Sequence, residues 1–302
     1  IKIFNWLGTM WGGQIRFTTP MLFSIGLVSM FTIGGLSGVT HSLVPHDTQQ
    51  HDTYYIVAHF HYVLFGGALF GLFGGIYFWF PKMFGHLLNE KMGKLHFALM
   101  LIGFNLTFAP MHLLGLNGMP RRYYTYADGM GWNFWNAIVG IGALIIAASF
   151  IVFVVNIWMS RKNPAAGADP WDARSVEWLT SSPPPVHNFD EIPTISDRDE
   201  LWYRKYTQAP DAEPVRVPAG GSTDNPGGPY GDRVSGKTAK ELGIHMPDSS
   251  WFPLTLSLGL PIAAYGVFYE GATMIALLAI GGIITFGSMI GWALEPSAEG
   301  DH

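Results

Sequence analysis

One stretch of the chain, residues 53–80, contains no Lys, Arg, Asp or Glu. A helix needs about 20 predominantly apolar residues to cross the hydrocarbon core of a bilayer, and this stretch is longer than that. Because lipid offers no hydrogen-bonding partners, a segment in the membrane must satisfy its backbone polar groups internally. A continuous apolar run of this length therefore predicts a transmembrane α-helix.

Apolar stretches of the same character recur along the chain. They cover residues 18–44, 96–116, 133–158, 251–268 and 272–294. Between them we expect a short polar linker at 45–50, a basic loop at 81–94 and a flexible linker at 219–228. The composition agrees, since 49% of the residues are hydrophobic and only 13% are charged. We therefore predict an all-α fold, a polytopic bundle of transmembrane helices. The last two stretches should form a helical hairpin that turns at residues 269–271.

The composition also divides the chain into three predicted parts. Residues 1–162 should form a membrane core, and residues 250–302 should hold the final hairpin. Between them, residues 163–249 are rich in Pro, Gly, Ser, Asp and Glu, which is typical of coil and flexible linker.

The charges that flank the predicted spans are distributed unevenly. If successive spans alternate in direction, Arg121 and Arg122 fall on one side of the membrane. The cations on the other side are Arg16, Lys82, Lys91, Lys94, Arg161 and Lys162. By the positive-inside rule, the second side is cytoplasmic, and so are the linker and the C-terminus.

Two histidines, His59 and His61, lie about two turns inside the stretch 53–80. An ionisable side chain at that depth is costly and marks a functional candidate. At about 100° per residue the two rings point roughly 200° apart, so they cannot bind one metal ion. Imidazole is an axial ligand of haem iron, and one helix serving two haems is the favoured interpretation. The alternative is a pair of histidines that only pack against neighbouring helices.

The absence of cysteine limits the metal chemistry of the chain. Disulfides, iron–sulfur clusters and thiolate copper sites cannot be built from these residues. The formal net charge of -5 gives no case for nucleic acid as a partner.

Two motifs carry a resemblance to a known family. Residues 51–64 read His-Asp-Thr-Tyr-Tyr-Ile-Val-Ala-His-Phe-His-Tyr-Val-Leu, and residues 118–123 read Gly-Met-Pro-Arg-Arg-Tyr. Both resemble subunit I of the haem-copper oxidases, specifically of cytochrome c oxidase. The resemblance covers residues 1 to about 160 and corresponds to the end of helix VIII through helix XII. The final hairpin resembles a small accessory subunit fused to the tail.

The resemblance implies ligands for metal centres. His59 would be the proximal ligand of the high-spin haem at the oxygen site, and His61 an axial ligand of the low-spin haem. His51 and Asp52 match a pair that holds Mg or Mn near the outer surface.

The resemblance also implies roles for four charged residues. Arg121, Arg122 and Asp47 match residues near the haem propionates, and Lys2 matches the lysine of a proton channel. The alternatives are an exposed arginine pair in a loop, an Asp47 that caps the next helix, and a lysine at the membrane interface. Two further histidines, His41 and His46, match no role in the family.

The implied activity is reduction of O₂ to water with electrons from cytochrome c, coupled to proton pumping in a bacterial plasma membrane. The copper ligands of the oxygen site and the second low-spin haem ligand would lie outside this chain. The expected partners are therefore the N-terminal half of subunit I, subunit II with a dinuclear copper centre, and subunit III. A-type haems are expected. A quinol oxidase of the same superfamily and a structural membrane chain without haem stay open as alternatives.

Overall fold

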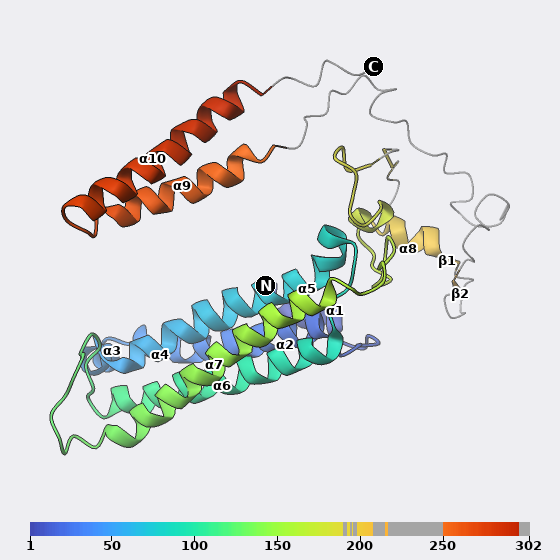
Figure 1. Ribbon diagram of the computed structural model, residues 1–302. Coiled ribbons are helices and arrows are strands. Elements are labelled where there is room, and N and C mark those ends of the chain that lie inside the picture. The colour runs from blue at the N-terminus through green and yellow to red at the C-terminus, as the bar shows by residue number, and fades with distance from the viewer. Residues whose placement is uncertain (190–191, 194, 196–197, 208–214, 217–249, 296–302) are drawn as a thin grey trace. The chain divides into compact units, whose positions relative to one another are not determined.

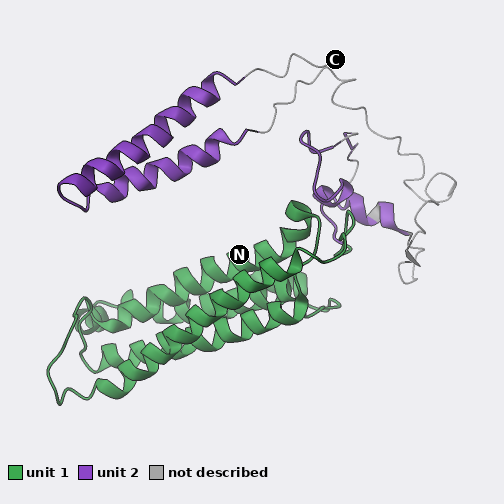
Figure 2. Ribbon diagram, viewed as in Figure 1, with its two compact units in different colours: residues 1–172 green, residues 173–302 purple. Residues whose placement is uncertain are grey.

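The computed structural model describes residues 1–189, 192–193, 195, 198–207, 215–216 and 250–295. Contacts between residues divide the chain into two compact units, Ile1–Asp172 and Ala173–His302 (Figure 2). The predicted flexible linker at residues 219–228 lies outside the described residues. The division into parts at 1–162, 163–249 and 250–302 therefore stays a prediction.

The first unit is a bundle of helices (Figure 1). Its elements are α1 (Lys2–Met10), α2 (Thr19–His41), α3 (Val44–Gln50), α4 (Tyr54–Val63), the π-helix η1 (Leu64–Leu69), α5 (Phe70–Phe84), α6 (Glu90–Leu116) and α7 (Asn133–Ser160). The all-α prediction is confirmed, because the strands in the described part of the chain, β1 (Tyr206–Thr207) and β2 (Val215–Arg216), have only two residues each.

Within the described residues, five helices are long and apolar enough to cross a membrane. They are Thr19–His41, Tyr54–Phe84, Glu90–Leu116, Asn133–Ser160 and Ala272–Ala293. The sixth predicted stretch, 251–268, forms a shorter helix, α9 (Phe252–Gly266). Its 15 residues span about 22 Å at 1.5 Å per residue, which is less than the hydrocarbon thickness. The difference arises because the chain already leaves the helix at Val267 to make the turn before Gly271.

Two predicted polar connections are more helical than expected. Residues 45–50, expected as a linker, lie within α3. The basic loop expected at 81–94 is reduced to 85–89, because α5 continues through Pro81 to Phe84 and α6 begins at Glu90. The side chain of Asn89 caps α6 by accepting a hydrogen bond from Met92 N at 3.1 Å.

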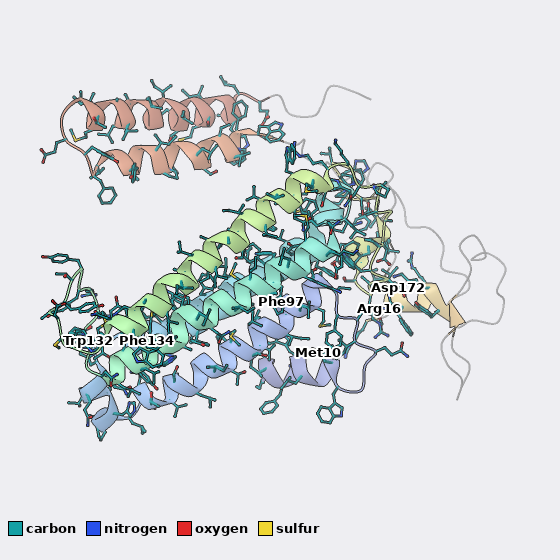
Figure 3. The ribbon with its side chains drawn as sticks, turned by 60° about the horizontal axis from the view of Figure 1, so that its bottom comes forward. Met10, Arg16, Phe97, Trp132, Phe134 and Asp172 are labelled. Carbon is teal, nitrogen blue, oxygen red and sulfur yellow. The ribbon has the colours of Figure 1, made fainter. Side chains whose placement is uncertain are left out.

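The spans alternate in direction, as the charge analysis assumed. At one end of the bundle, Thr19 N donates to Glu90 Oε1 at 2.7 Å, which joins the starts of α2 and α6. At the other end, Arg121 N donates to Asp52 O at 2.9 Å. Figure 3 shows Arg16 at the first end, and Trp132 with the adjacent Phe134 at the opposite end. The two groups of cations therefore lie at opposite ends of the bundle.

An aromatic core holds α2 against α5 and α6. Phe23, Phe70 and Phe104 are each 0% exposed, and the Phe23 and Phe70 rings meet edge to face at 5.8 Å between centroids. Helices α6 and α7 approach more closely, because small residues stand where they cross. A Cβ atom added at Gly142 of α7 would lie 2.6 Å from the backbone nitrogen of Thr107.

The polypeptide that follows α7 is fixed to the end of the bundle. Asn163 Nδ2 donates to Leu87 O at 2.7 Å, Lys82 Nζ donates to Ala168 O at 3.1 Å, and Trp171 Nε1 donates to Phe78 O at 2.7 Å. The first ten or so residues of the predicted coil are thus held against the end of α5 and the 85–89 loop.

The second unit contains η2 (Val176–Leu179), α8 (Glu200–Lys205), the antiparallel pair β1 and β2, and a hairpin of α9 with α10 (Ala272–Ala293). The predicted hairpin is confirmed in its helical form and in its turn before α10. Its helices are joined by Ser288 Oγ, which donates to Thr255 Oγ1 at 2.8 Å.

A matched pair of alanine substitutions tests the contact between α6 and α7. Gly142→Ala should destabilise the bundle by about 1–3 kcal/mol, because the new methyl group meets the backbone of α6. Gly140→Ala is the control, since nothing lies within 4 Å of a Cβ atom at that position. Thermal denaturation of the detergent-solubilised protein should show a lower midpoint only for Gly142→Ala. Equal midpoints would contradict the close crossing.

Candidate functional site

The candidate site is built on α4, and its first turn is fixed at both the side-chain and the backbone level. Thr53 caps the helix: its Oγ1 accepts a hydrogen bond from Tyr55 N at 3.2 Å and donates to Gln50 O at 2.8 Å. Tyr54 N donates to Met119 O at 2.9 Å, which ties the start of α4 to the segment after α6. These contacts fix the start of α4, and therefore the positions of His59 and His61 along the helix axis.

His59 faces α2. Its Nδ1 lies 2.9 Å from Gly34 O and 3.0 Å from Ser37 Oγ. A carbonyl oxygen only accepts, so Nδ1 carries the hydrogen and Nε2 keeps its lone pair. The ring is half-buried. The backbone of α2 thus selects the tautomer in which Nε2 is ready to bind a metal.

His61 faces α6. Its Nδ1 lies 2.8 Å from Val57 O, one turn earlier in the same helix, and its ring stacks on Phe108 with centroids 4.2 Å apart and planes 13° apart. The same argument leaves Nε2 with its lone pair. The two imidazoles therefore lie against different helices, which is the arrangement that the spacing of His59 and His61 predicts.

The helix changes its winding directly after His61. The next turn is the π-helix Leu64–Leu69, which contains Gly66 and Gly67. A Cβ atom at Gly66 would lie 2.7 Å from Met30 Cβ, so α2 passes close to this turn. π-helical turns occur frequently at functional sites. The sequence did not predict this turn, although the adjacent glycines mark its position.

Several of the predicted site residues lie at the outer end of α4. Asp52 pairs through Oδ1 with Arg121 Nη2 and lies with Oδ2 3.4 Å from His51 Nε2. Both Asp52 and Arg122 have positive φ angles, 57° and 71°, and Arg122 is exposed. The structure thus brings His51, Asp52 and Arg121 together. Among the described residues no three His, Cys, Asp or Glu side chains are grouped to hold a metal, so the Mg or Mn site stays a prediction.

Asp47 lies in α3 and contacts a histidine. Its Oδ1 is 3.2 Å from His41 Nδ1, and the His41 ring lies 5.1 Å from the His59 ring. The alternative in which Asp47 caps the next helix is wrong, because Thr53 caps α4. The His46 ring is 6.0 Å from the ring of Tyr55. Sequence reasoning had assigned no role to either histidine.

Lys2 lies in the first turn of α1, and its side chain is exposed. Its predicted place in a proton channel stays a prediction, as do the haem-propionate roles of Arg121, Arg122 and Asp47.

The arrangement defines a polytopic membrane protein whose second long span carries two metal-competent imidazoles on different faces. Residues 1–145 match the family described as Cytochrome C and Quinol oxidase polypeptide I. This part of the chain belongs to that family, the subunit I polypeptides of the haem-copper oxidases.

Individual relatives match with substantial identity. Cytochrome c oxidase subunit 1 of Bacillus subtilis (strain 168) is 45% identical over 294 residues, which cover 96% of this chain and 44% of that protein. Cytochrome c oxidase subunit 1 of Thermostichus vulcanus is 55% identical over 65% of this chain and 35% of that protein. Quinol oxidase subunit 1 of Bacillus spizizenii is 39% identical over 89% of this chain and 38% of that protein.

Two facts follow from these matches. The chain spans less than half the length of the curated relatives it matches. The match to the Bacillus subtilis protein covers so much of this chain that it must extend into the α9–α10 hairpin. The similarity of this hairpin to a fused accessory subunit stays a prediction.

The family implies haem and copper, and the residues of this chain fit the first of these groups. His59 and His61 each present an unprotonated Nε2, which is the atom that an imidazole offers to haem iron. The described residues do not fit a copper site, which needs a group of several ligands that this part of the chain does not assemble.

The N-cap of α4 can be tested without any cofactor. Thr53→Val should lower the stability of the bundle by about 1 kcal/mol, because Tyr55 N loses its acceptor at the start of the helix. Thr53→Ser keeps the hydroxyl and should behave like the unmodified protein. Thermal denaturation in detergent compares the two variants, and equal midpoints would rule out the capping role.

Proposed function

We propose that the chain forms part of the catalytic subunit of a respiratory terminal oxidase. This enzyme would reduce O₂ to water with electrons from cytochrome c and couple the reaction to proton pumping. The observation that carries the proposal is the pair His59 and His61. Both lie on one transmembrane helix, face different neighbouring helices, and have Nδ1 held by a backbone carbonyl. The family membership of residues 1–145 supports the same conclusion.

The two histidines hold and orient the haems in this proposal. His61 would hold the iron of the low-spin haem, and His59 would hold the iron of the high-spin haem. When bound, the haems supply the electron transfer and oxygen chemistry, while the protein supplies ligation, orientation and charge. We take the haems to be A-type. Copper at the oxygen site would be held by residues outside this chain.

Charged residues at the outer end complete the proposed site. Arg121, Arg122 and Asp47 lie near the haem propionates, where Arg offers two parallel donors to a carboxylate. His51 and Asp52 contribute to a Mg or Mn site. The pairing of Arg121 with Asp52 supports this assignment, since it places both residues at the same end of the bundle as the first turn of α4.

The electron donor distinguishes two related proposals. Relatives of this chain include both cytochrome c oxidase and quinol oxidase subunits. Cytochrome c is the preferred electron donor, and its electrons would enter through a dinuclear copper centre. The cysteine ligands of that centre must come from subunit II, because this chain has no cysteine. Spectra of the assembled complex and the copper content of subunit II distinguish the cytochrome c oxidase proposal from the quinol oxidase proposal.

The proposal places the chain in a bacterial plasma membrane with the N-terminal half of subunit I, subunit II and subunit III as partners. The segment after α7 and the C-terminus lie on the cytoplasmic side. For the segment after α7, this orientation is supported by the cations at the same end of the bundle, which include Arg16, Lys82 and Arg161. Five helices in the described part of the chain are long and apolar enough to cross a membrane, which supports the multi-pass topology.

Substitution of each histidine tests the proposal. His61→Ala should remove the low-spin haem from the assembled complex, and His59→Ala should remove the high-spin haem, because each ring faces a different helix. His86→Ala, in the loop at the opposite end of α5, is the control and should leave both haems in place. Reduced-minus-oxidised absorption spectra separate the two components. Loss of the same component from both variants would refute the two-sided arrangement.

The proton-channel role of Lys2 predicts a kinetic effect without loss of haem. Lys2→Met should slow reduction of the oxygen site strongly, because it removes the one cationic group of α1. Lys162→Met, beyond the end of α7, is the control. Stopped-flow reduction measures the rate, and haem content is measured in parallel. Normal kinetics in Lys2→Met would reject the assignment.

A further inference from the structure

Three neighbouring residues of α2 lie against one side of the His59 ring. Gly34, Ser37 and Gly38 have the i, i+3, i+4 spacing of one helix face. Gly34 O and Ser37 Oγ lie 2.9 Å and 3.0 Å from His59 Nδ1. A Cβ atom added at Gly38 would lie 2.8 Å from His59 Cε1. One face of α2 therefore contacts the imidazole at its Nδ1 edge and leaves it room beside Cε1.

The hydrogen-bond directions among these groups follow from their chemistry. The Ser37 hydroxyl has one hydrogen, which it donates to Gly34 O at 2.9 Å. Its oxygen lone pair then faces His59 Nδ1, so the N–H of the ring is shared between Ser37 Oγ and Gly34 O. Ser37 is only 8% exposed, and water therefore does not compete for this contact.

Ser37 differs from three of the other hydroxyl residues of α2, whereas Thr40 resembles it, since Thr40 Oγ1 donates to Ser37 O three residues earlier and lies 3.3 Å from the Tyr55 hydroxyl on α4. Ser24, Ser29 and Thr32 each donate to the carbonyl four residues earlier, at 2.9, 2.8 and 2.7 Å, and their hydroxyls stay on their own helix. Ser37 donates to the carbonyl three residues earlier instead. Ordinary back-bonding within a helix explains the first three, whereas Ser37 also reaches a ring on α4.

We propose that Ser37 is a positioning residue for His59 and that Gly38 is the space the ring requires. The inference rests on the proposed function, in which His59 Nε2 binds the high-spin haem. A hydrogen bond at Nδ1 fixes the orientation of a ligating imidazole and makes Nε2 a stronger donor to the metal. Ser37 thus strengthens the bond between His59 and iron and favours the oxidised state of that haem.

The hydroxyl is tested in the assembled oxidase complex by the iron–histidine stretching band in the resonance Raman spectrum of the reduced high-spin haem. Ser37→Ala should move this band to lower frequency and raise the midpoint potential of the high-spin haem. Ser37→Thr keeps a hydroxyl and should restore both values. Ser29→Ala removes a hydroxyl from the same helix without touching His59 and should change neither.

The space beside the ring is tested by a second pair of variants. Gly38→Ala should displace the imidazole and reduce high-spin haem content, because its methyl group overlaps Cε1. Gly35→Ala is the control, since nothing lies within 4 Å of a Cβ atom there. If Ser37→Ala does not assemble, Ser37→Cys replaces it, and its weaker acceptor should move the band in the same direction.

The outcomes separate this inference from the proposed function. If His59→Ala leaves the iron–histidine band intact, His59 is not the ligand and the proposed role of this residue fails. If His59→Ala abolishes the band but Ser37→Ala and Ser37→Cys leave it unmoved, the role of Ser37 is overturned while that of His59 stands.

Discussion

The interior of a membrane contains no water, so a polar side chain placed there depends on a partner within the protein. The two histidines of α4 meet this demand in different ways. His59 takes its partners from α2, at Gly34 and Ser37, and His61 takes the carbonyl of Val57 on its own helix. In both rings the partnered nitrogen is Nδ1. Nε2 therefore keeps its lone pair in both rings. The proposed binding of haem iron depends on this choice of tautomer.

A third histidine of the bundle, His96, lies in the packed interior and has different surroundings. It is 0% exposed, its Nδ1 lies 3.1 Å from the hydroxyl of Tyr77, and that hydroxyl accepts from Asn156 Nδ2 at 3.4 Å. Its ring stacks on Phe153, 5.2 Å between centroids. These contacts link α5, α6 and α7 to one another. His96 is thus enclosed by side chains from several helices, whereas His59 and His61 are only partly buried and have Nδ1 beside a backbone carbonyl.

Much of this arrangement can be predicted from residues alone. The absence of charge in 53–80 predicts the long span, and a step of 100° per residue predicts that His59 and His61 face different helices. Contacts between segments far apart in the chain could not be predicted. The pairing of Asp52 with Arg121 and the approach of Ser37 to His59 depend on how α2, α4 and α6 pack. The helical form of residues 45–50 was also missed, because their polar composition resembles that of a linker.

The π-helical turn Leu64–Leu69 changes the directions in which the side chains of the long span point. One extra residue in a turn rotates all later side chains by about 100° about the helix axis. Residues before and after the turn therefore do not follow one continuous helical pattern. The first half directs its imidazoles toward α2 and α6. The second half directs Phe70, Phe73 and Tyr77 into the aromatic core. A single helical wheel drawn over the whole span would merge these faces. The insertion lets one helix present a ligand surface and a packing surface whose directions are set independently.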